Sequence, residues 1–368
     1  MKKTIAQFVD TTVYGGAEAV VVDIAAELAK RGYDAPVYHF PSPDLEHRAQ
    51  SRGVELRLLE DWPAYKSWKT LPFFARRFAK RLCRENVSVL HSHLFGSSIG
   101  GGLSATFARL PHVATLHDIY TLEEHTAFRV RALQGTAFLG TYFVTVAQFL
   151  EDFLRRHAFF PRDRLRTIYN GINPDLKPTR PRAEVRAELG VAESEMLLLT
   201  VGRLVELKRQ WLLVEAFARI PASTPARLVI AGDGPERRTL EALIEKLGVG
   251  ERVKLIGFQT DVPSYLAACD CFALVSETEC LSCSILEAMA AGLPVLATKV
   301  GGNPELIEAN VTGRFVDPDP ESIAKQVVLL TQSPTELRRL GENGAARLRR
   351  LFTIEKMIVS YEGLYSQR

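Results

Sequence analysis

Two glutamates, Glu279 and Glu287, stand eight positions apart in the stretch ETECLSCSILEAMAAGLPVLAT (277–298). The apolar run CFALVS (271–276) before them is typical of a strand, and the residues from about 284 are typical of a helix. The loop between them therefore directs backbone N–H groups and a helix N-terminus to one place, where a phosphate can bind. Glu287, expected in the first turn of the helix, can accept hydrogen bonds from a pair of ribose hydroxyls. The alternative is an ordinary helix start whose glutamate complements the macrodipole.

Two cations follow another predicted strand. In VGRLVELK (201–208), Arg203 and Lys208 come directly after the apolar run 196–202. Positive charge at the carboxyl end of a strand is what a departing diphosphate needs. Taken alone, the two side chains would indicate only a solvated loop.

A pair of glycines, Gly15 and Gly16, lies between the apolar run 4–9 and the helical pattern 17–32. Glycine lets the backbone approach a ligand closely at a helix start. A tight turn explains the pair equally well. The chain has no GxGxxG after this strand, which disfavours a dinucleotide site and an NAD-dependent oxidoreductase.

These residues need a scaffold, and the chain alternates apolar runs with helical patterns from end to end. The runs lie at 4–9, 35–40, 87–93, 112–118, 142–148, 196–202, 226–234, 252–258, 271–276 and 294–298. Such alternation predicts an α/β protein made of two Rossmann-like units in tandem. We place the domains at 1–172 and 173–352, because 167–181 is rich in Pro, Asn and Gly. The amphipathic segment 353–368 is expected to rejoin the first domain as a helix.

The composition is that of a globular protein able to bury two cores. The 368 residues are 46% hydrophobic and 24% charged, with a net charge of +3. The N-terminal apolar run is too short for a signal peptide, and no run has the length of a membrane span. Five cysteines, an odd count, favour reduced thiols and a cytoplasmic location. The first half carries the positive balance and all the histidines, which makes it the half to suspect of meeting an anionic partner.

The segment 62–86 interleaves aromatic and basic side chains, with no acid from Lys66 to Arg84. A stretch of this kind can lie on an anionic membrane surface, at the inner face of the cell membrane. It can equally be a helix with a solvated basic face and a buried aromatic face. No DNA- or RNA-binding motif accompanies the charge, so nucleic acid is not an expected partner.

Two groups of residues look like metal ligands and are interpreted otherwise. Asp317-Pro318-Asp319 resembles a metal-chelating DxD, but it stands in a Pro-rich turn before a helix, where capping is the better interpretation. Four thiols fall within fifteen residues, and their spacing is not that of a known zinc knuckle. They are Cys269, Cys271, Cys280 and Cys283.

His91 and His93 alternate on a predicted strand and therefore point to one face. A zinc pair is less expected there than pocket lining or a hydrogen-bonded core. We place both near the cleft that would receive an acceptor.

Taken together, the motifs resemble those of the retaining glycosyltransferases of family 4, which have the GT-B fold. The resemblance covers nearly the whole chain, and the order and spacing of the pieces make it specific. The pieces are YGGAE (14–18), TLHD (115–118), YNGIN (169–173), VGRLVELK (201–208), AGDGPER (231–237), the Glu279/Glu287 pair and GGNPELI…VTGRFVDPDP (301–320).

Carried over residue by residue, the resemblance implies a role for each charged position. Glu287 is similar to the glutamate that binds the ribose, and Glu279 to the one near the hydroxyls of the transferred sugar. Arg203 and Lys208 match the pair on the diphosphate. His117 matches a histidine that faces the donor sugar.

Main-chain groups complete the implied donor site. Gly15 and Gly16 match the loop that approaches the donor from the N-terminal domain, and the main chain at Gly257 and Phe258 meets the base. The family usually has glycine where this chain has Cys280, and a side chain there would change the loop's path or narrow the sugar pocket. The loop contributes Cys280, Leu281, Ser282 and Cys283.

The resemblance implies transfer from a nucleotide-diphosphate sugar, UDP-sugar favoured and GDP-sugar the alternative, to a glycan or lipid-linked saccharide. Cell-surface polysaccharide or lipopolysaccharide assembly is the expected setting. The implied retaining mechanism has the leaving phosphate oxygen take the acceptor's proton, so no cofactor and no metal is expected. Two rivals stay open: a sugar-nucleotide-binding protein that has lost turnover, and an epimerase or hydrolase on the same fold. The second needs acid/base groups, and residues 181–368 contain no histidine.

Overall fold

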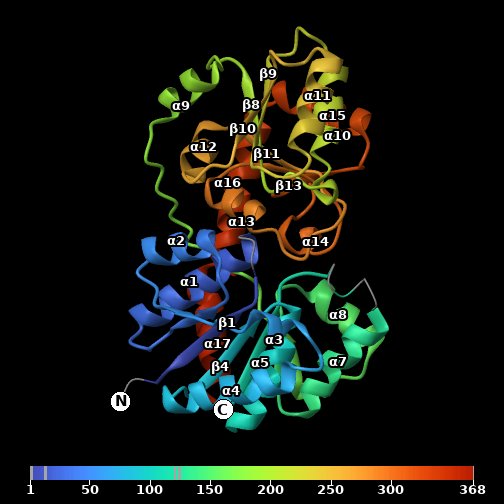
Figure 1. Cartoon of the computed structure of the whole chain (residues 1–368). Helices are drawn as coiled ribbons and strands as arrows, with labels where there is room; N and C mark the ends of the chain where they lie inside the picture. Colours follow the sequence, from blue (N-terminus) through green and yellow to red (C-terminus); the bar gives the residue numbers. More distant parts are fainter. Residues whose placement is uncertain (1–2, 12–14, 120–121, 123–125, 368) are drawn as a thin grey trace. The chain divides into compact units, whose positions relative to one another are not determined.

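The computed structural model describes residues 3–11, 15–119, 122 and 126–367, and the chain divides into two compact units (Figure 1). Unit 1 comprises Met1–Asn170 and Lys356–Arg368, and unit 2 comprises Gly171–Glu355. Each unit has its own parallel sheet, so the predicted α/β class is confirmed.

The sheet of unit 1 consists, in the described residues, of seven strands in the order β3-β2-β1-β4-β5-β6-β7. All neighbouring strands are parallel, and β1, β4 and β5 are buried along their whole length. Strands covered on both faces appear in a sequence as continuous apolar runs, which is why most of them could be predicted. The bounds are β1 Ile5–Val9, β2 Val37–His39, β3 Leu56–Leu58, β4 Val89–His93, β5 His112–Leu116, β6 Tyr142–Thr145 and β7 Leu165–Thr167.

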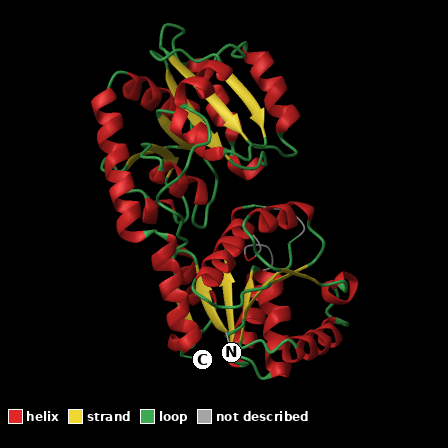
Figure 2. Cartoon of the chain, turned by 90° about the vertical axis from the view of Figure 1, so that its left-hand side faces the viewer, coloured by secondary structure: helices red, strands yellow, loops and turns green. Residues whose placement is uncertain are grey.

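Helices lie on both sides of this sheet (Figure 2). They are α1 Gly16–Lys30, α2 Pro43–Ser51, α3 Trp62–Lys66, α4 Leu71–Arg84, α5 Phe95–Ala108, α7 Thr126–Phe138, α8 Gln148–His157 and α17 Ile354–Ser366. A 3₁₀ turn, η1 Arg162–Arg164, precedes β7.

The sheet of unit 2 has six strands, all within the described residues, in the order β10-β9-β8-β11-β12-β13. Its strands are β8 Met196–Val201, β9 Ala226–Ala231, β10 Val253–Gly257, β11 Cys271–Leu274, β12 Val295–Thr298 and β13 Gly313–Val316. Its helices are α9 Arg182–Leu189, α10 Gln210–Arg219, α11 Arg237–Leu247, α12 Val262–Ala268, α13 Cys283–Ala290, α14 Asn303–Leu306, α15 Pro320–Thr331 and α16 Pro334–Leu351, with the 3₁₀ turn η2 Glu206–Lys208. The strand order reverses at β8, between β9 and β11, which makes this the switch point of the sheet.

The last helix, α17, packs against the sheet of unit 1, as the red helix near β1 and β4 in Figure 1 shows. Tyr361 and Tyr365 are buried, and their hydroxyls bond the side chains of Thr115 and His91 at 3.0 and 2.7 Å. Arg31 of α1 pairs with Glu362 at 2.5 Å on the rim. The helix therefore closes the core of unit 1 from more than two hundred residues away along the chain.

The basic, aromatic segment 62–86 forms α3 and α4, and most of its rings are internal. Tyr65, Phe74 and Phe78 are buried against Phe8 of β1, with ring centroids 5.1–6.5 Å apart. Helix α4 therefore has a buried aromatic face, as the second of the two interpretations of this segment expected. The rings of Trp68 and Phe73 remain exposed.

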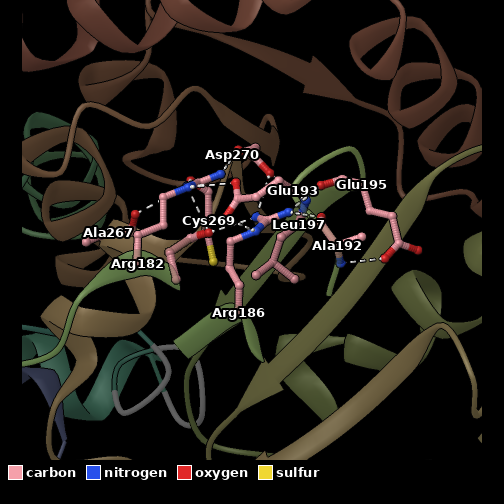
Figure 3. Close-up of polar contacts among 10 residues, drawn as sticks. Arg182, Arg186, Ala192, Glu193, Glu195, Leu197, Ala267, Cys269 and Asp270 are labelled. Carbon is pink, nitrogen blue, oxygen red and sulfur yellow. Dashed lines mark hydrogen bonds and ion pairs between the residues drawn. The ribbon is translucent and has the colours of Figure 1, made fainter. Parts of the chain in front are cut away.

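A buried arginine clamps the amino ends of β8 and β11 in unit 2 (Figure 3). Arg186 of α9 is 1% exposed and donates to the carbonyls of Ala192, Glu195 and Ala268 at 2.6–3.0 Å. It also pairs with Asp270, whose carboxylate accepts from the backbone N–H of residue 197 at 2.8 Å. A buried guanidinium is costly unless it is paired, and here both terminal nitrogens are hydrogen-bonded while Nε lies 3.5 Å from the carboxylate of Glu193. The clamp sets the register of the two strands whose opposite ends carry the predicted cations and acids.

Two further sequence interpretations are settled by local structure. Asp319 is the N-cap of α15, and its side chain accepts from the backbone N–H of Ser322 at 2.7 Å, so the predicted capping role is confirmed. No helix in the described part of the chain combines the length and apolar character required to cross a bilayer.

Candidate functional site

The candidate site lies where β8, β11 and β12 end, at the switch point of the unit 2 sheet. Loops 202–209 and 275–282 are tied together by the backbone N–H of Glu277, which donates to the carbonyl of Leu207 at 2.8 Å. Thr298, at the end of β12, donates its hydroxyl to the carbonyl of Ser276 at 2.7 Å. Three loops from neighbouring strands are thereby held at one edge of the sheet, where α/β proteins bind their ligands.

Lys208 and Glu279 meet at this edge, as a side-chain ion pair. Lys208 Nζ lies 2.5 Å from Glu279 Oε1, and the hydroxyl of Ser276 donates to the same oxygen at 2.6 Å. Glu279 is 7% exposed, and Lys208 is half-buried. The charge-assisted bonds hold both side chains in one orientation beside the strand ends.

Arg203 projects from the same loop as Lys208 and is exposed to solvent. The side-chain amide of Gln210 donates to the backbone carbonyl of Arg203 at 2.9 Å, and this bond holds the backbone of the loop in place. Among the residues that the structure describes, the guanidinium has no ion-pair partner, so it is available to an anionic ligand.

Helix α13 begins at Cys283, and Ser282 caps it, accepting from the backbone N–H of Ile285 at 3.3 Å. Cys280 and Leu281 are buried in the loop before it. The placement of Glu287 in the first turn is wrong. Because the helix starts one residue earlier than expected, Glu287 follows that turn, which holds no acid.

Two glycines brace the loop that carries Glu279, and sequence reasoning used them only as part of a family motif. Gly301 has φ +51°, and a Cβ there would lie 1.7 Å from the carbonyl oxygen of Glu279. The next residue, Gly302, donates its N–H to the same carbonyl at 3.1 Å. The signal in the sequence is the glycine pair that begins three residues after the apolar run 294–298, where one backbone can approach another closely. Ser276, the other residue not predicted, ends a plain apolar run and gives no such signal.

Gly257 and Phe258, predicted to meet a base, lie at the end of β10 on the outer side of β9. Gly257 has φ +71° and accepts from the backbone N–H of Gly232 at 2.8 Å. The ring of Phe258 is 68% exposed. An exposed aromatic ring beside a glycine is open to stacking by a planar ligand.

Three predicted residues belong to unit 1. Gly15 is the N-cap of α1 and Gly16 its first residue, whereas residues 12–14 of the same loop lie outside the described residues. His117 follows β5 and is buried, and its Nε2 lies 3.1 Å from Nδ1 of His93. Burial lowers the pKa of His117 from its usual value to about 3, so the ring is neutral.

His91 and His93 do not line a cleft, and the other interpretation, a hydrogen-bonded core, describes both rings. Both rings are 0% exposed and share one face of β4, with centroids 4.1 Å apart. His91 packs against Tyr361 and Tyr365 of α17, and His93 bonds the side chains of Gln7 and His117.

The thiols and the other possible metal ligands are dispersed. Cys269 and Cys271 are buried, and burial raises the pKa of both thiols. Over the described ranges, no three His, Cys, Asp or Glu side chains are placed to hold a metal ion.

Comparison with known proteins finds two family models that together span most of the chain. The model of Glycosyltransferase Family 4 matches residues 14–176, and that of Glycosyl transferases group 1 matches residues 181–347. An uncharacterized glycosyltransferase of Methanocaldococcus jannaschii is 30% identical over 85% of this chain and 84% of its own length. The N-acetyl-alpha-D-glucosaminyl L-malate synthase of Bacillus anthracis is 29% identical over 95% and 93% of the two chains.

Solved structures resemble the whole fold. HepE of Anabaena, in complex with UDP and glucose, superposes with a TM-score of 0.88 at 24% identity, covering both chains completely. Sucrose-phosphate synthase of Thermosynechococcus elongatus gives 0.84 at 24% identity, over 100% of this chain and 99% of its own. The predicted GT-B fold is thereby confirmed.

Proposed function

The chain belongs to the glycosyltransferases of family 4, and on that premise we propose that it transfers a sugar from a nucleotide-diphosphate sugar with retention of anomeric configuration. The observation that carries the proposal is the Lys208–Glu279 pair at the switch point of the unit 2 sheet, beside Arg203. Two cations and a buried acid at such an edge suit an anionic diphosphate and the hydroxyls of a sugar.

The proposed reaction breaks the bond between the anomeric carbon and the phosphate oxygen. The acceptor oxygen bonds to the same face of that carbon, and its proton passes to the departing phosphate oxygen. The products are a glycoside and a nucleoside diphosphate. The protein contributes orientation and charge: Lys208, Arg203 and the N-terminus of α13 neutralise the leaving group.

Charge neutralisation by these side chains does not call for a divalent ion. We therefore expect turnover to persist in EDTA, and an absolute requirement for added manganese would contradict this part of the proposal.

UDP is the favoured nucleotide of the donor, with GDP the alternative. The support is indirect: HepE, whose fold this chain shares, was solved in complex with UDP and glucose. Cys280 stands where the family usually has glycine, and its side chain is buried. We expect this side chain to affect which sugar fits the pocket rather than which nucleotide binds.

The proposed acceptor is a glycan or a lipid-linked saccharide, bound by unit 1. Relatives include a lipopolysaccharide core biosynthesis glycosyltransferase of Rhizobium meliloti, 34% identical over 50% of this chain and 53% of its own. Attachment to an anionic membrane through Trp68, Phe73 and the basic face of α4 stays a prediction. Co-sedimentation with phosphatidylglycerol vesicles tests it.

A thermal-shift panel of UDP, GDP, ADP and CDP tests donor binding directly. A ligand that binds only the folded state at a hundred times its Kd adds about 2.7 kcal/mol of stability, which raises Tm by several degrees. We expect this for UDP, and for none of the four if the premise of a nucleotide site is wrong. Incubating the matching nucleotide sugars with glycan and lipid acceptors then separates a transferase from a binding protein, and product analysis separates it from an epimerase.

A further inference from the structure

A line of three buried polar side chains crosses the sheet of unit 1. Gln7 lies on β1, His93 ends β4, and His117 directly follows β5, on three neighbouring strands. Gln7 Oε1 lies 2.9 Å from His93 Nε2, and His93 Nδ1 lies 3.1 Å from His117 Nε2. Gln7 and His93 are fully buried, and His117 is 9% exposed.

The hydrogen bonds along this line all donate in one direction, because the side-chain amide of Gln7 is held in one orientation. The amide nitrogen of Gln7 donates to the carbonyl of Ile5 at 3.3 Å, which turns its oxygen toward His93. An amide oxygen only accepts, so His93 must carry its proton on Nε2. Burial keeps the pKa of His93 well below its usual value, so the ring is neutral and its Nδ1 is a lone pair.

The same reasoning then fixes the next ring. Since His93 Nδ1 can only accept, His117 must donate from Nε2. His117 is also neutral, so its Nδ1 is left as a lone pair. That atom is buried and has no hydrogen-bond partner among the described residues. A buried acceptor without a partner is costly unless a ligand completes it.

The other buried histidines lack this constraint. His112 contacts the hydroxyls of Thr141 and Ser92 at 2.9 Å, and His91 contacts those of Tyr365 and Thr115. Hydroxyls rotate and serve as donor or acceptor, so either tautomer of these rings is satisfied. The directed line is therefore a property of Gln7, His93 and His117.

We propose that Gln7 and His93 are positioning residues that hold His117 as its Nε2–H tautomer, so that Nδ1 presents a fixed hydrogen-bond acceptor to a saccharide hydroxyl. A hydroxyl can donate to this atom, whereas a phosphate or carbonyl oxygen is repelled by it. The identity of the ligand rests on the proposed function. The tautomer does not, because it follows from contacts within unit 1.

The tautomer is measured on the full chain with ¹⁵N-labelled histidine, by long-range ¹H–¹⁵N correlation, which separates protonated from bare ring nitrogens. His117→Asn and His93→Asn assign the signals. We expect both rings to be neutral with the proton on Nε2. A proton on Nδ1 of either ring, or a charged ring at pH 7.5, would overturn the proposal, whatever the enzyme's activity.

Gln7→Met tests the origin of the constraint, because it keeps the length of the side chain and removes the fixed acceptor. We expect both rings to become mixtures of tautomers and kcat/KM for transfer to fall roughly tenfold, the effect of one lost hydrogen bond. Thr141→Val, which removes a partner of His112, is the matched control and should leave the His117 signals unchanged.

The outcomes separate the two proposals. If the tautomers are as expected but the protein transfers no sugar, the proposed function is wrong, whereas the positioning of His117 by Gln7 and His93 stands. Scrambled tautomers in Gln7→Met with kcat/KM unchanged within twofold would show that the fixed acceptor is not used, and would overturn the inference.

Discussion

At the scale of single residues, the proposed chemistry uses an ion pair that a bound diphosphate would share. Lys208 and Glu279 are bonded to each other at 2.5 Å. A diphosphate that binds beside them offers Lys208 a second anionic partner, while Ser276 continues to hold the carboxylate. Lys208 could therefore turn to the diphosphate while Glu279, still bonded by Ser276, keeps a hydrogen-bond partner.

Lys208→Met should lower kcat/KM for transfer by about 10²–10³, the usual cost of one electrostatic contact to a departing group. Arg203→Ala should act in the same direction. Steady-state rates with a UDP-sugar measure both. Lys246→Met, on the exposed end of α11, is the matched control and should be unchanged.

A double variant distinguishes contact with the donor from mere support of Glu279. If Lys208 only holds the carboxylate, Lys208→Met combined with Glu279→Gln should be no worse than Glu279→Gln alone. If the cation contacts the phosphates as proposed, the double variant should be slower by a further tenfold or more.

Residue types could be predicted better than residue positions. The cations and acids stood out because they follow apolar runs, and Lys208 and Glu279 do meet. Glu287 was misplaced because the start of α13 depends on the Ser282 cap, which no periodicity reveals. The burial of His91 could not be predicted, because its cover, α17, is supplied from the far end of the chain.

At the scale of elements, the loop carrying Glu279 is shaped by its close approach to Gly301. Buried parallel strands were predictable as apolar runs, whereas β3, β13 and α14, of three to four residues each, leave no period to detect. The contact between loops was equally hidden, because it joins backbone atoms rather than side chains.

Gly301→Ala should displace the Glu279 loop and weaken binding of a nucleoside diphosphate at least tenfold, because the new Cβ collides with a carbonyl oxygen. Gly292→Ala is a matched control: its φ of +72° imposes similar strain, but nothing lies within 4 Å of the added atom. The positive φ alone should cost each variant about 1–2 kcal/mol of stability, and the collision adds to this loss in Gly301→Ala. Calorimetry should show weaker binding of the nucleoside diphosphate only for Gly301→Ala. Equal affinities of the two variants would show that the collision does not affect binding.

Helix α17 allows a second test on one element. Tyr365→Phe removes the hydroxyl that bonds His91, which should cost about 1–3 kcal/mol and several degrees in the Tm of unit 1. Gly363→Ala, on the same helix with open space around the new Cβ, should be neutral or stabilising by up to about 1 kcal/mol. A Tyr365→Phe protein as stable as the parent would show that the hydroxyl contact does not contribute to the stability of unit 1.

At the scale of the whole molecule, the chain is two α/β units that the sequence predicts from alternation alone. The boundary predicted at 172 and the observed division after Asn170 differ by two residues. What alternation does not reveal is the distribution of titratable groups. The buried histidines all lie in unit 1.

This distribution predicts that unit 1 loses stability in acid. Burial lowers the pKa of His112 to about 3, against an ordinary value of 6.5 in the unfolded chain. Between these values the unfolded state binds a proton that the folded state excludes, so the free energy of unfolding falls as the pH falls below 6.5. The loss is about 1.4 kcal/mol per pH unit for each such ring, and none arises above pH 6.5.

The tryptophans allow this to be measured on unit 1 alone. Trp62 and Trp68 belong to unit 1 and Trp211 to unit 2, so Trp211→Phe leaves a fluorescence signal that reports unit 1. In that background, His112→Gln should be less stable than the parent at pH 7.5, and the gap in urea should narrow by about 2 kcal/mol at pH 5. Asp10 and Asp23, whose pKa values burial raises, act in the opposite sense but are present in both proteins and cancel. A gap that does not change with pH would show that His112 takes up its proton as readily in the folded state as in the unfolded one.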